Sequence, residues 1–230
     1  MSEAVRLAEL DLLRGIAILL MIIFHTVFDL AFYYGWPLDY LDGFWYYEGK
    51  ASAVLFMLVS GISNIFSHQP VRRGLIVFGT GLFITVITYL YSPAVYIRFG
   101  ILHLLGVGML ATPFLNQRSA LPLILAGLSI LAVGNSFSQI TSTTAFLVPF
   151  GIKPPGFTSL DYYPLLPWLG IILFGMAIGK LLYPDKQSLC PSAANHPPVR
   201  WLSWLGRRSL FIYLMHQPVI LAILYIINPK

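Results

Sequence analysis

The sequence has few charged residues, few cysteines and no strand-like patterning. Charged residues make up 10% of the 230 residues, whereas a soluble domain carries about 25%, so a water-soluble globular domain is excluded. The single cysteine, Cys190, excludes an internal disulfide and a thiolate metal cluster. Segments of alternating apolar and polar residues, which mark membrane β-barrels, are missing. Metal-binding HExxH and phosphate-binding glycine-loop patterns are also missing.

Long apolar runs are abundant instead, since 57% of the residues are hydrophobic. A run of about 18 or more such residues is typical of a transmembrane helix. We expect an all-α, polytopic helix bundle of seven spans, or eight if one is missed, forming a single domain over residues 1–230. The predicted spans are Leu10–Tyr34, Trp45–Phe66, Val71–Tyr91, Ile97–Leu115, Leu121–Phe137, Pro164–Tyr183 and Leu202–Ile227.

The cations predict how these spans are oriented. With a cytoplasmic N-terminus, ten of the fourteen Lys and Arg residues fall on the inner side, which is the expected positive-inside bias. This pattern explains the net charge of +5 without nucleic acid as a partner. Seven spans would place the C-terminus outside, and eight would place it inside. The inner cations are Arg6, Arg14, Arg72, Arg73, Arg118, Lys180, Lys186, Arg200, Arg207 and Arg208; the outer ones are Lys50, Arg98, Lys153 and Lys230.

Four ionisable residues interrupt the first apolar run, LDLLRGIAILLMIIFHTVFDL. At 100° per residue, His25 lies about 20° from Arg14 around the helix, and Asp11 and Asp29 each lie about 60° from Arg14 in the same sense. All four therefore share one face. Arg14 and His25 are about 16 Å apart along the axis. Asp29 follows His25 by four residues, so we expect its carboxylate to orient the imidazole. Charged groups within a span favour an internal site.

Later spans supply further candidates. We expect His103 in the outer half of the fourth span and Arg98 at its outer rim. His216 is predicted near the middle of the last span, with Arg207 and Arg208 at its inner edge. A histidine oriented by a carboxylate suits general-base catalysis, and an inner arginine suits an anion arriving from the cytoplasm. An acyl-CoA donor suits both the histidine and the arginine. The acceptor would attack the thioester directly, or the acyl group would pass through a transient acyl-histidine.

Five segments in order, RLAELDLLRGIAILLMIIFHTVFDL, LFMLVSGIS, RFGILHLLGVGML, YYPLLPWLGIILFGMAIGK and SLFIYLMHQP, resemble the heparan-α-glucosaminide N-acetyltransferase-like membrane proteins of bacteria and archaea, in the transmembrane acyltransferase superfamily. The spacing of Arg14 and His25 also resembles the first-helix signature of the membrane O-acyltransferases.

The resemblance implies acetyl transfer from cytoplasmic acetyl-CoA to a sugar amine or hydroxyl at the outer side of the plasma membrane. By this resemblance Arg14 binds the donor and His25 is catalytic, with Asp29 as the catalytic partner that orients it. From their positions in the spans, Arg207 and Arg208 are further donor-binding candidates, and Arg98, His103 and His216 are candidates for binding the acceptor. No metal is implied.

Two other functions fit the same residues. In a small-solute or proton-coupled transporter, Asp29, His25 and His103 would form a proton relay rather than a base. In a membrane scaffold or sensor the polar face would affect stability alone. Two loops add to the functional surface: the aromatic, acidic GWPLDYLDGFWYYEGK and the long segment 137–163, which would line the interface, re-enter the membrane or cover a cavity.

Overall fold

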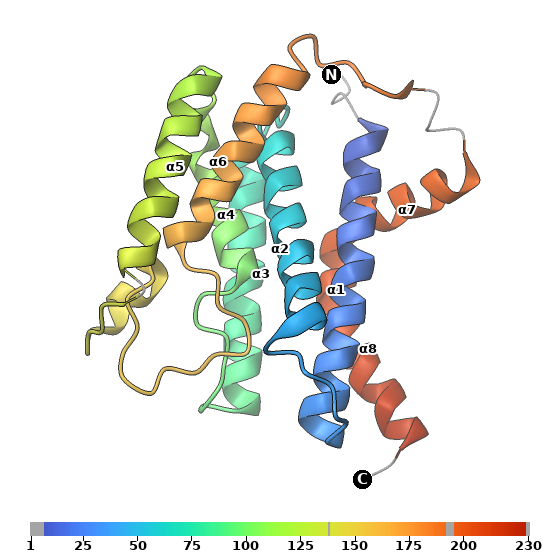
Figure 1. Ribbon diagram of the computed structural model, residues 1–230. Helices are drawn as coiled ribbons and strands as arrows, with labels where there is room; N and C mark the ends of the chain where they lie inside the picture. Colours follow the sequence, from blue (N-terminus) through green and yellow to red (C-terminus); the bar gives the residue numbers. More distant parts are fainter. Residues whose placement is uncertain (1–6, 138, 192–195, 229–230) are drawn as a thin grey trace. The chain divides into compact units, whose positions relative to one another are not determined.

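The computed structural model describes residues 7–137, 139–191 and 196–228, and these residues form an all-α fold without a strand (Figure 1). Arg6 and Lys230, two of the cations used to predict the orientation, lie outside the described residues. The elements are α1 (Ala8–Tyr34), α2 (Gly43–Asn64), α3 (Pro70–Tyr91), α4 (Ile101–Leu115), α5 (Ala120–Phe137), the 3₁₀ helix η1 (Ala145–Phe150), α6 (Leu165–Leu182), α7 (Pro197–Arg207) and α8 (Ser209–Ile227).

Five of these helices, α1, α3, α5, α6 and α8, are long and apolar enough to cross a membrane. The chain is therefore a multi-pass membrane protein. Helix α2 has 22 residues, but its first half carries Glu48 and Lys50 and is less apolar. Helix α4 is apolar but only 15 residues long. Each of the first six predicted spans thus corresponds to one helix, while the number of spans that cross and the cytoplasmic N-terminus stay predictions.

The last predicted span, Leu202–Ile227, differs from the observed helices. Its first residues belong to α7, which ends at Arg207, and the membrane-length helix α8 begins only at Ser209. The physical reason is composition: α7 interleaves Arg200, Ser203 and Arg207 with apolar residues, which favours an amphipathic helix over a spanning one. Helix α7 begins at Pro197, five residues before the predicted span.

The chain divides into two compact units. Residues 57–186 form the middle unit, and the described parts of residues 6–56 and 187–230 form the terminal unit. Helix α2 continues from the terminal unit into the middle unit between Phe56 and Met57. The expectation of a single domain over residues 1–230 stays a prediction.

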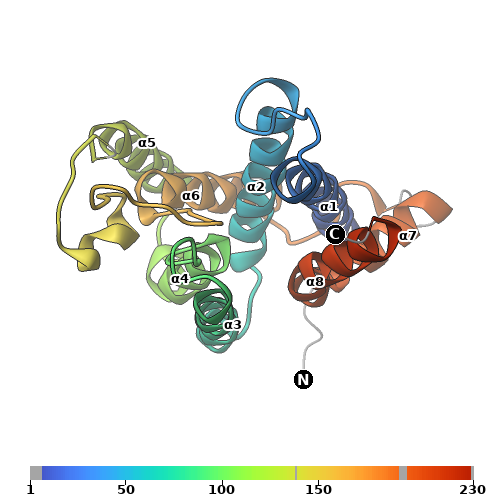
Figure 2. The same ribbon diagram turned by 90° about the horizontal axis from the view of Figure 1, so that it is seen from below.

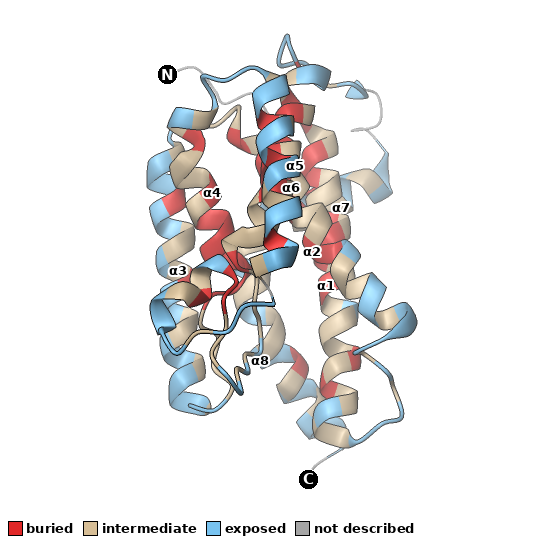
Figure 3. Cartoon of the chain, turned by 60° about the vertical axis from the view of Figure 1, so that its left-hand side comes forward, coloured by how far each residue is buried: buried red, intermediate tan, exposed pale blue. Residues whose placement is uncertain are grey.

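In the middle unit α4 lies between α3 and α6, and α5 packs along α6 (Figure 2). Its apolar core contains Leu123, Leu173, Met176 and Ala177. Figure 3 shows the buried residues along α4 in red. The second half of α2 joins this core through two glycines: a Cβ on Gly61 would meet the Gly175 Cα at 2.9 Å. Small residues allow such close approach of membrane helices.

The segment from η1 to α6 folds back onto the start of α4. Leu160 and Tyr163 donate backbone hydrogen bonds to Val95 (2.9 Å) and Phe99 (2.9 Å). The Asp161 carboxylate accepts the Ile101 amide at 2.9 Å, which stabilises the positive N-terminal end of α4. The Tyr162 hydroxyl donates to the Val148 carbonyl at 2.7 Å, and burial raises the pKa of Tyr162 to about 12. These bonds hold the long loop against the middle unit.

In the terminal unit α8 lies beside α1, and α7 crosses the N-terminal part of α1 (Figure 2). The crossing depends on two glycines, because a Cβ on Gly206 would collide with the Asp11 carbonyl and one on Gly15 with the Leu202 carbonyl. The Ser203 hydroxyl adds a 3.3 Å hydrogen bond to the Ala8 carbonyl. Helix α8, which follows the turn after α7, therefore begins near the level of Gly15 along the α1 axis.

Candidate functional site

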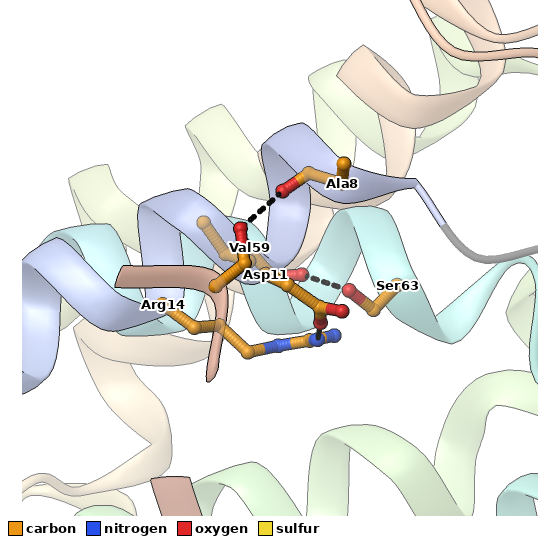
Figure 4. Close-up of polar contacts among 6 residues, drawn as sticks. Ala8, Asp11, Arg14, Val59 and Ser63 are labelled. Atoms are coloured by element: carbon orange, nitrogen blue, oxygen red, sulfur yellow. Dashed lines mark hydrogen bonds and ion pairs between the residues drawn. The ribbon is translucent and has the colours of Figure 1, made fainter. Parts of the chain in front are cut away.

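The predicted polar face of α1 divides into an N-terminal ion pair and a C-terminal cluster. Near the N-terminus, Arg14 donates to the Asp11 carboxylate at 2.7 Å (Figure 4). Asp11 is buried, while the Arg14 side chain is 23% exposed. Asp11 thus stabilises the arginine within the helix, and the Arg14 side chain stays partly exposed.

His25 lies in the C-terminal cluster with a defined ring orientation. Its Nδ1 is 2.8 Å from the Met21 carbonyl oxygen, one turn earlier on α1. Because a carbonyl oxygen only accepts hydrogen bonds, Nδ1 carries the proton of the neutral ring. Nε2 therefore holds the lone pair. This tautomer leaves His25 with the nitrogen that a general base requires.

His216, from the first half of α8, packs against His25. The two ring centroids are 4.6 Å apart with an interplanar angle of 77°. His216 Nδ1 lies 2.6 Å from the Tyr213 carbonyl oxygen, so the neutral ring again carries its proton on Nδ1. Its Nε2 is buried and has no hydrogen-bond partner among the described residues. The parallel neighbours α1 and α8 thus bring together two histidines that are far apart in the sequence.

Asp29 also belongs to the cluster, and its hydrogen-bond partner there is Gln217 rather than His25. Asp29 is 0% exposed, and its Oδ1 accepts a 2.7 Å hydrogen bond from Gln217 Nε2. The described residues show no hydrogen bond between His25 and Asp29, in contrast to the expectation that the carboxylate orients the imidazole. The reason is local: the Met21 carbonyl already holds His25 Nδ1. Sequence reasoning missed Gln217, whose only signal was its place beside His216.

The unpaired polar atoms of this cluster are all hydrogen-bond acceptors. Asp29 Oδ2, His216 Nε2 and Gln217 Oε1 are buried without a partner in the described part of the chain. All three accept hydrogen bonds, the Gln217 oxygen being identified because its NH₂ group faces a carboxylate. Buried polar groups are almost always hydrogen-bonded. The cluster therefore suits a ligand group that donates several hydrogen bonds.

Glu48 on α2 is a second residue that the sequence analysis did not single out. Both of its carboxylate oxygens are buried and unpaired among the described residues. The next residue, Gly49, packs against the Phe24 ring, and Ser52 donates a 2.9 Å hydrogen bond to the Ala17 carbonyl. Because these contacts pair later residues of α2 with earlier residues of α1, the two helices are antiparallel. Glu48 therefore lies near the level of His25 along α1.

His103 and Arg98 lie in the middle unit. His103 Nδ1 accepts the Gly100 amide at 3.1 Å, and its Nε2 donates to the Thr85 hydroxyl at 3.4 Å, so both ring nitrogens are used within this unit. The Arg98 guanidinium lies 4.9 Å from the ring centroids of Tyr96 and of Phe157. The acceptor contacts expected for His103 and Arg98 stay predictions.

Arg207 and Arg208 lie at the end of α7, beside the crossing with α1. Arg207 is exposed, and the Arg208 guanidinium stacks 4.3 Å from the Trp204 ring. Gly206 packs on the Asp11 carbonyl, so the two arginines and Arg14 belong to the same end of the terminal unit. His25 follows Arg14 by eleven residues, about 16 Å of helix.

Comparisons with known proteins identify the family of the chain. The family model described as "Heparan-alpha-glucosaminide N-acetyltransferase, catalytic" matches residues 6–218, which include both ends of the polar face and the α8 residues that contact it. No curated protein and no solved structure matches the chain. Because the match covers most of the sequence, this multi-pass membrane protein belongs to the heparan-alpha-glucosaminide N-acetyltransferase catalytic family, a family of membrane acetyltransferases.

Proposed function

We propose that the chain is an integral membrane acyltransferase that transfers an acyl group, the acetyl group in the first instance, from cytoplasmic acyl-CoA to a sugar amine or hydroxyl at the outer side of the plasma membrane. The whole chain would act as one transferase domain. The observation that carries the proposal is the cluster of His25, His216, Asp29 and Gln217, whose unpaired buried atoms all accept hydrogen bonds. A sugar presents several O–H or N–H donors to such a cluster.

The protonation states of the cluster suggest the reaction steps. The acceptor oxygen or nitrogen attacks the thioester carbonyl carbon while His25 Nε2 removes its proton. The C–S bond then breaks, and the imidazolium returns that proton to the departing thiolate of CoA. Asp29 stabilises the positive charge that forms transiently on the nearby imidazoles. Transfer through an acyl-histidine would use the same Nε2 as the nucleophile.

The donor would enter from the other end of α1. Arg14, Arg207 and Arg208 supply guanidinium groups there, which bind phosphates by paired hydrogen bonds. The distance of about 16 Å between Arg14 and His25 suits a donor whose thioester is carried on a long, thin arm. Asp29 and Gln217 would bind the acceptor from the opposite side.

The test is acyl transfer by the purified protein, with acetyl-CoA and a panel of amino sugars and glycans. We expect His25→Gln to lower turnover at least about 100-fold, because a general base contributes about 10² to 10⁴ to the rate, while CoA binding is kept. His68→Gln is the matched control, since His68 is exposed in the turn between α2 and α3 and lies outside the cluster.

Turnover that survives His25→Gln would remove His25 from the mechanism. A protein that binds no acyl-CoA would not be an acyltransferase. Proton or small-solute flux in liposomes without acyl-CoA turnover would instead identify a transporter that uses the same residues.

A further inference from the structure

An open pocket lies against α7, away from the His25–His216 cluster. Its volume is about 610 Å³. All of its walls belong to the terminal unit. It is lined by Ala8, Pro197, Arg200, Trp201, Ser203, Trp204 and Arg207.

The pocket faces one side of α7 because of residue spacing. Arg200, Trp204 and Arg207 are separated by four and three residues, so they share a face of the helix. Gly206 points to another side and packs on α1. Both guanidinium groups therefore border the same space, on a helix held firmly by its crossing with α1.

In the part of the chain that the structure describes, neither Arg200 nor Arg207 has a carboxylate within ion-pair distance, and both are exposed. Two described acids near the pocket are engaged elsewhere. Asp11 pairs with Arg14, and Glu9 accepts hydrogen bonds from the Ser188 hydroxyl (2.8 Å) and the Leu189 amide (2.9 Å). An anion that bound here would meet two unneutralised guanidiniums, which match the geometry of a phosphate group.

Two tryptophans supply the rest of the binding surface. Trp201 is 55% exposed and Trp204 is 44% exposed. Helix α7 is amphipathic and leads directly into the span α8, so it lies at the membrane surface, where tryptophan side chains are preferred. Arg208 fixes the Trp204 ring by stacking at 4.3 Å. The pocket thus joins paired cations to flat apolar surfaces.

We propose that the α7 pocket is a binding site for the phosphate group of an amphipathic or aromatic ligand. Arg200 and Arg207 hold the phosphate, and Trp201 and Trp204 contact the part of the ligand next to it. Two sources present this chemistry at a membrane surface: the headgroup of an anionic phospholipid and the nucleotide end of the acyl donor. Only the second source depends on the proposed acyltransferase function.

The experiment compares the two sources on the full-length protein in a neutral detergent. Coenzyme A binding is measured by calorimetry, and retention of phosphatidylglycerol over phosphatidylcholine is measured by native mass spectrometry. The variant is R200Q/R207Q. The matched control is R72Q/R73Q, which removes two exposed arginines of α3 in the middle unit. R200K/R207K keeps the charges but loses the paired hydrogen bonds.

We expect R200Q/R207Q to weaken binding of one source at least about tenfold, because the variant loses the hydrogen bonds between the charged guanidinium groups and the phosphate. R200K/R207K should be intermediate and the control unchanged. Loss of phosphatidylglycerol retention with CoA binding intact assigns the pocket to lipid, and the reverse result assigns it to the donor.

Equal binding of both probes by wild type and R200Q/R207Q overturns the proposal, as does an equal loss in the R72Q/R73Q control. Should R200Q/R207Q fail to fold, R200K/R207K and Trp204→Leu provide the same comparison. These outcomes are distinct from a failure of the proposed function, since lipid retention is measured without turnover.

Discussion

The three histidines of the helical core differ in which ring nitrogen is protonated. His25 and His216 each donate Nδ1–H to a carbonyl oxygen of their own helix, which leaves Nε2 as an acceptor. In His103 the Gly100 amide occupies Nδ1, and Nε2 donates to Thr85. His103 therefore stabilises the start of α4, whereas His25 and His216 each keep an unprotonated Nε2.

A single interaction links Asp29 to α8, and it leads to a prediction. Gln217→Met removes the 2.7 Å hydrogen bond to Asp29 and leaves a buried carboxylate without its donor. We expect kcat to fall about 10- to 100-fold, since hydrogen bonds to charged groups contribute about 1.5–3 kcal/mol. The KM for acyl-CoA should change less, because Gln217 lies in the cluster with His25 rather than beside the arginines proposed to bind the donor, and it positions Asp29.

A double-mutant cycle separates this role from a general loss of stability. Asp29→Asn, Gln217→Met and the double variant are compared in kcat and in thermal unfolding. Coupling between the two sites should appear in kcat, because they share one hydrogen bond. Additive effects on kcat, or coupling confined to unfolding, would show that Gln217 only supports packing.

The sequence names candidates on both helices, Arg14, His25 and Asp29 on α1 and His216 on α8, but it does not predict the contacts between the two helices. Helical arithmetic places Arg14, His25 and Asp29 on one face because those residues lie on one continuous helix. Gln217 is 188 residues from Asp29 in the chain. Its contact depends on the register between α1 and α8, which the crossing of α7 over α1 determines. Side-chain periodicity contains no information on that register.

At the scale of elements, the α1–α7 crossing depends on the absence of a side chain. A Cβ on Gly206 would collide with the backbone of Asp11, and backbone cannot rotate away as a flexible side chain does. We therefore expect Gly206→Ala to separate the helices and to lower the free energy of unfolding by about 1–3 kcal/mol. It should also weaken ligand binding in the α7 pocket. Thermal unfolding in detergent measures the first effect.

Gly79→Ala is the control for that substitution. Gly79 lies inside α3, and a Cβ there would meet nothing within 4 Å. Alanine favours helix over glycine by about 0.5–1 kcal/mol, so Gly79→Ala should be neutral or slightly stabilising. If Gly206→Ala behaves like Gly79→Ala, the two helices are not held at this distance by the glycine.

The elements that the sequence predicts best are those with long apolar runs. The predicted bounds of α1, α3 and α5 agree with the observed helices within two residues at each end. The sequence did not predict α7 as a separate helix. Its 11 residues are amphipathic, and its Trp and Leu residues continue into the apolar run of α8. The run alone does not show that the chain turns at Arg208. That turn follows from tertiary contacts, namely Gly15 and Gly206 at the crossing.

At the scale of the whole molecule, the direction of acyl transfer depends on which side of the membrane holds the N-terminal end of α1. Cys190 reports this side, because Ser188 and Leu189 bind Glu9 in the first turn of α1. Cys190 is also exposed and is the one cysteine of the chain. With a cytoplasmic N-terminus, Cys190 in intact cells should not react with a membrane-impermeant maleimide, and it should react after permeabilisation.

The opposite side is tested with C190S/D42C, since Asp42 is exposed in the loop after the other end of α1. This variant should be labelled in intact cells. Reversed labelling would place Arg14 and the α7 pocket outside, where cytoplasmic acyl-CoA cannot reach them. The donor would then have to enter at the His25 end, and the arginines would face an anion on the outer side. The labelling pattern thus decides whether Arg14 and His25 lie in the order that transfer from a cytoplasmic donor requires.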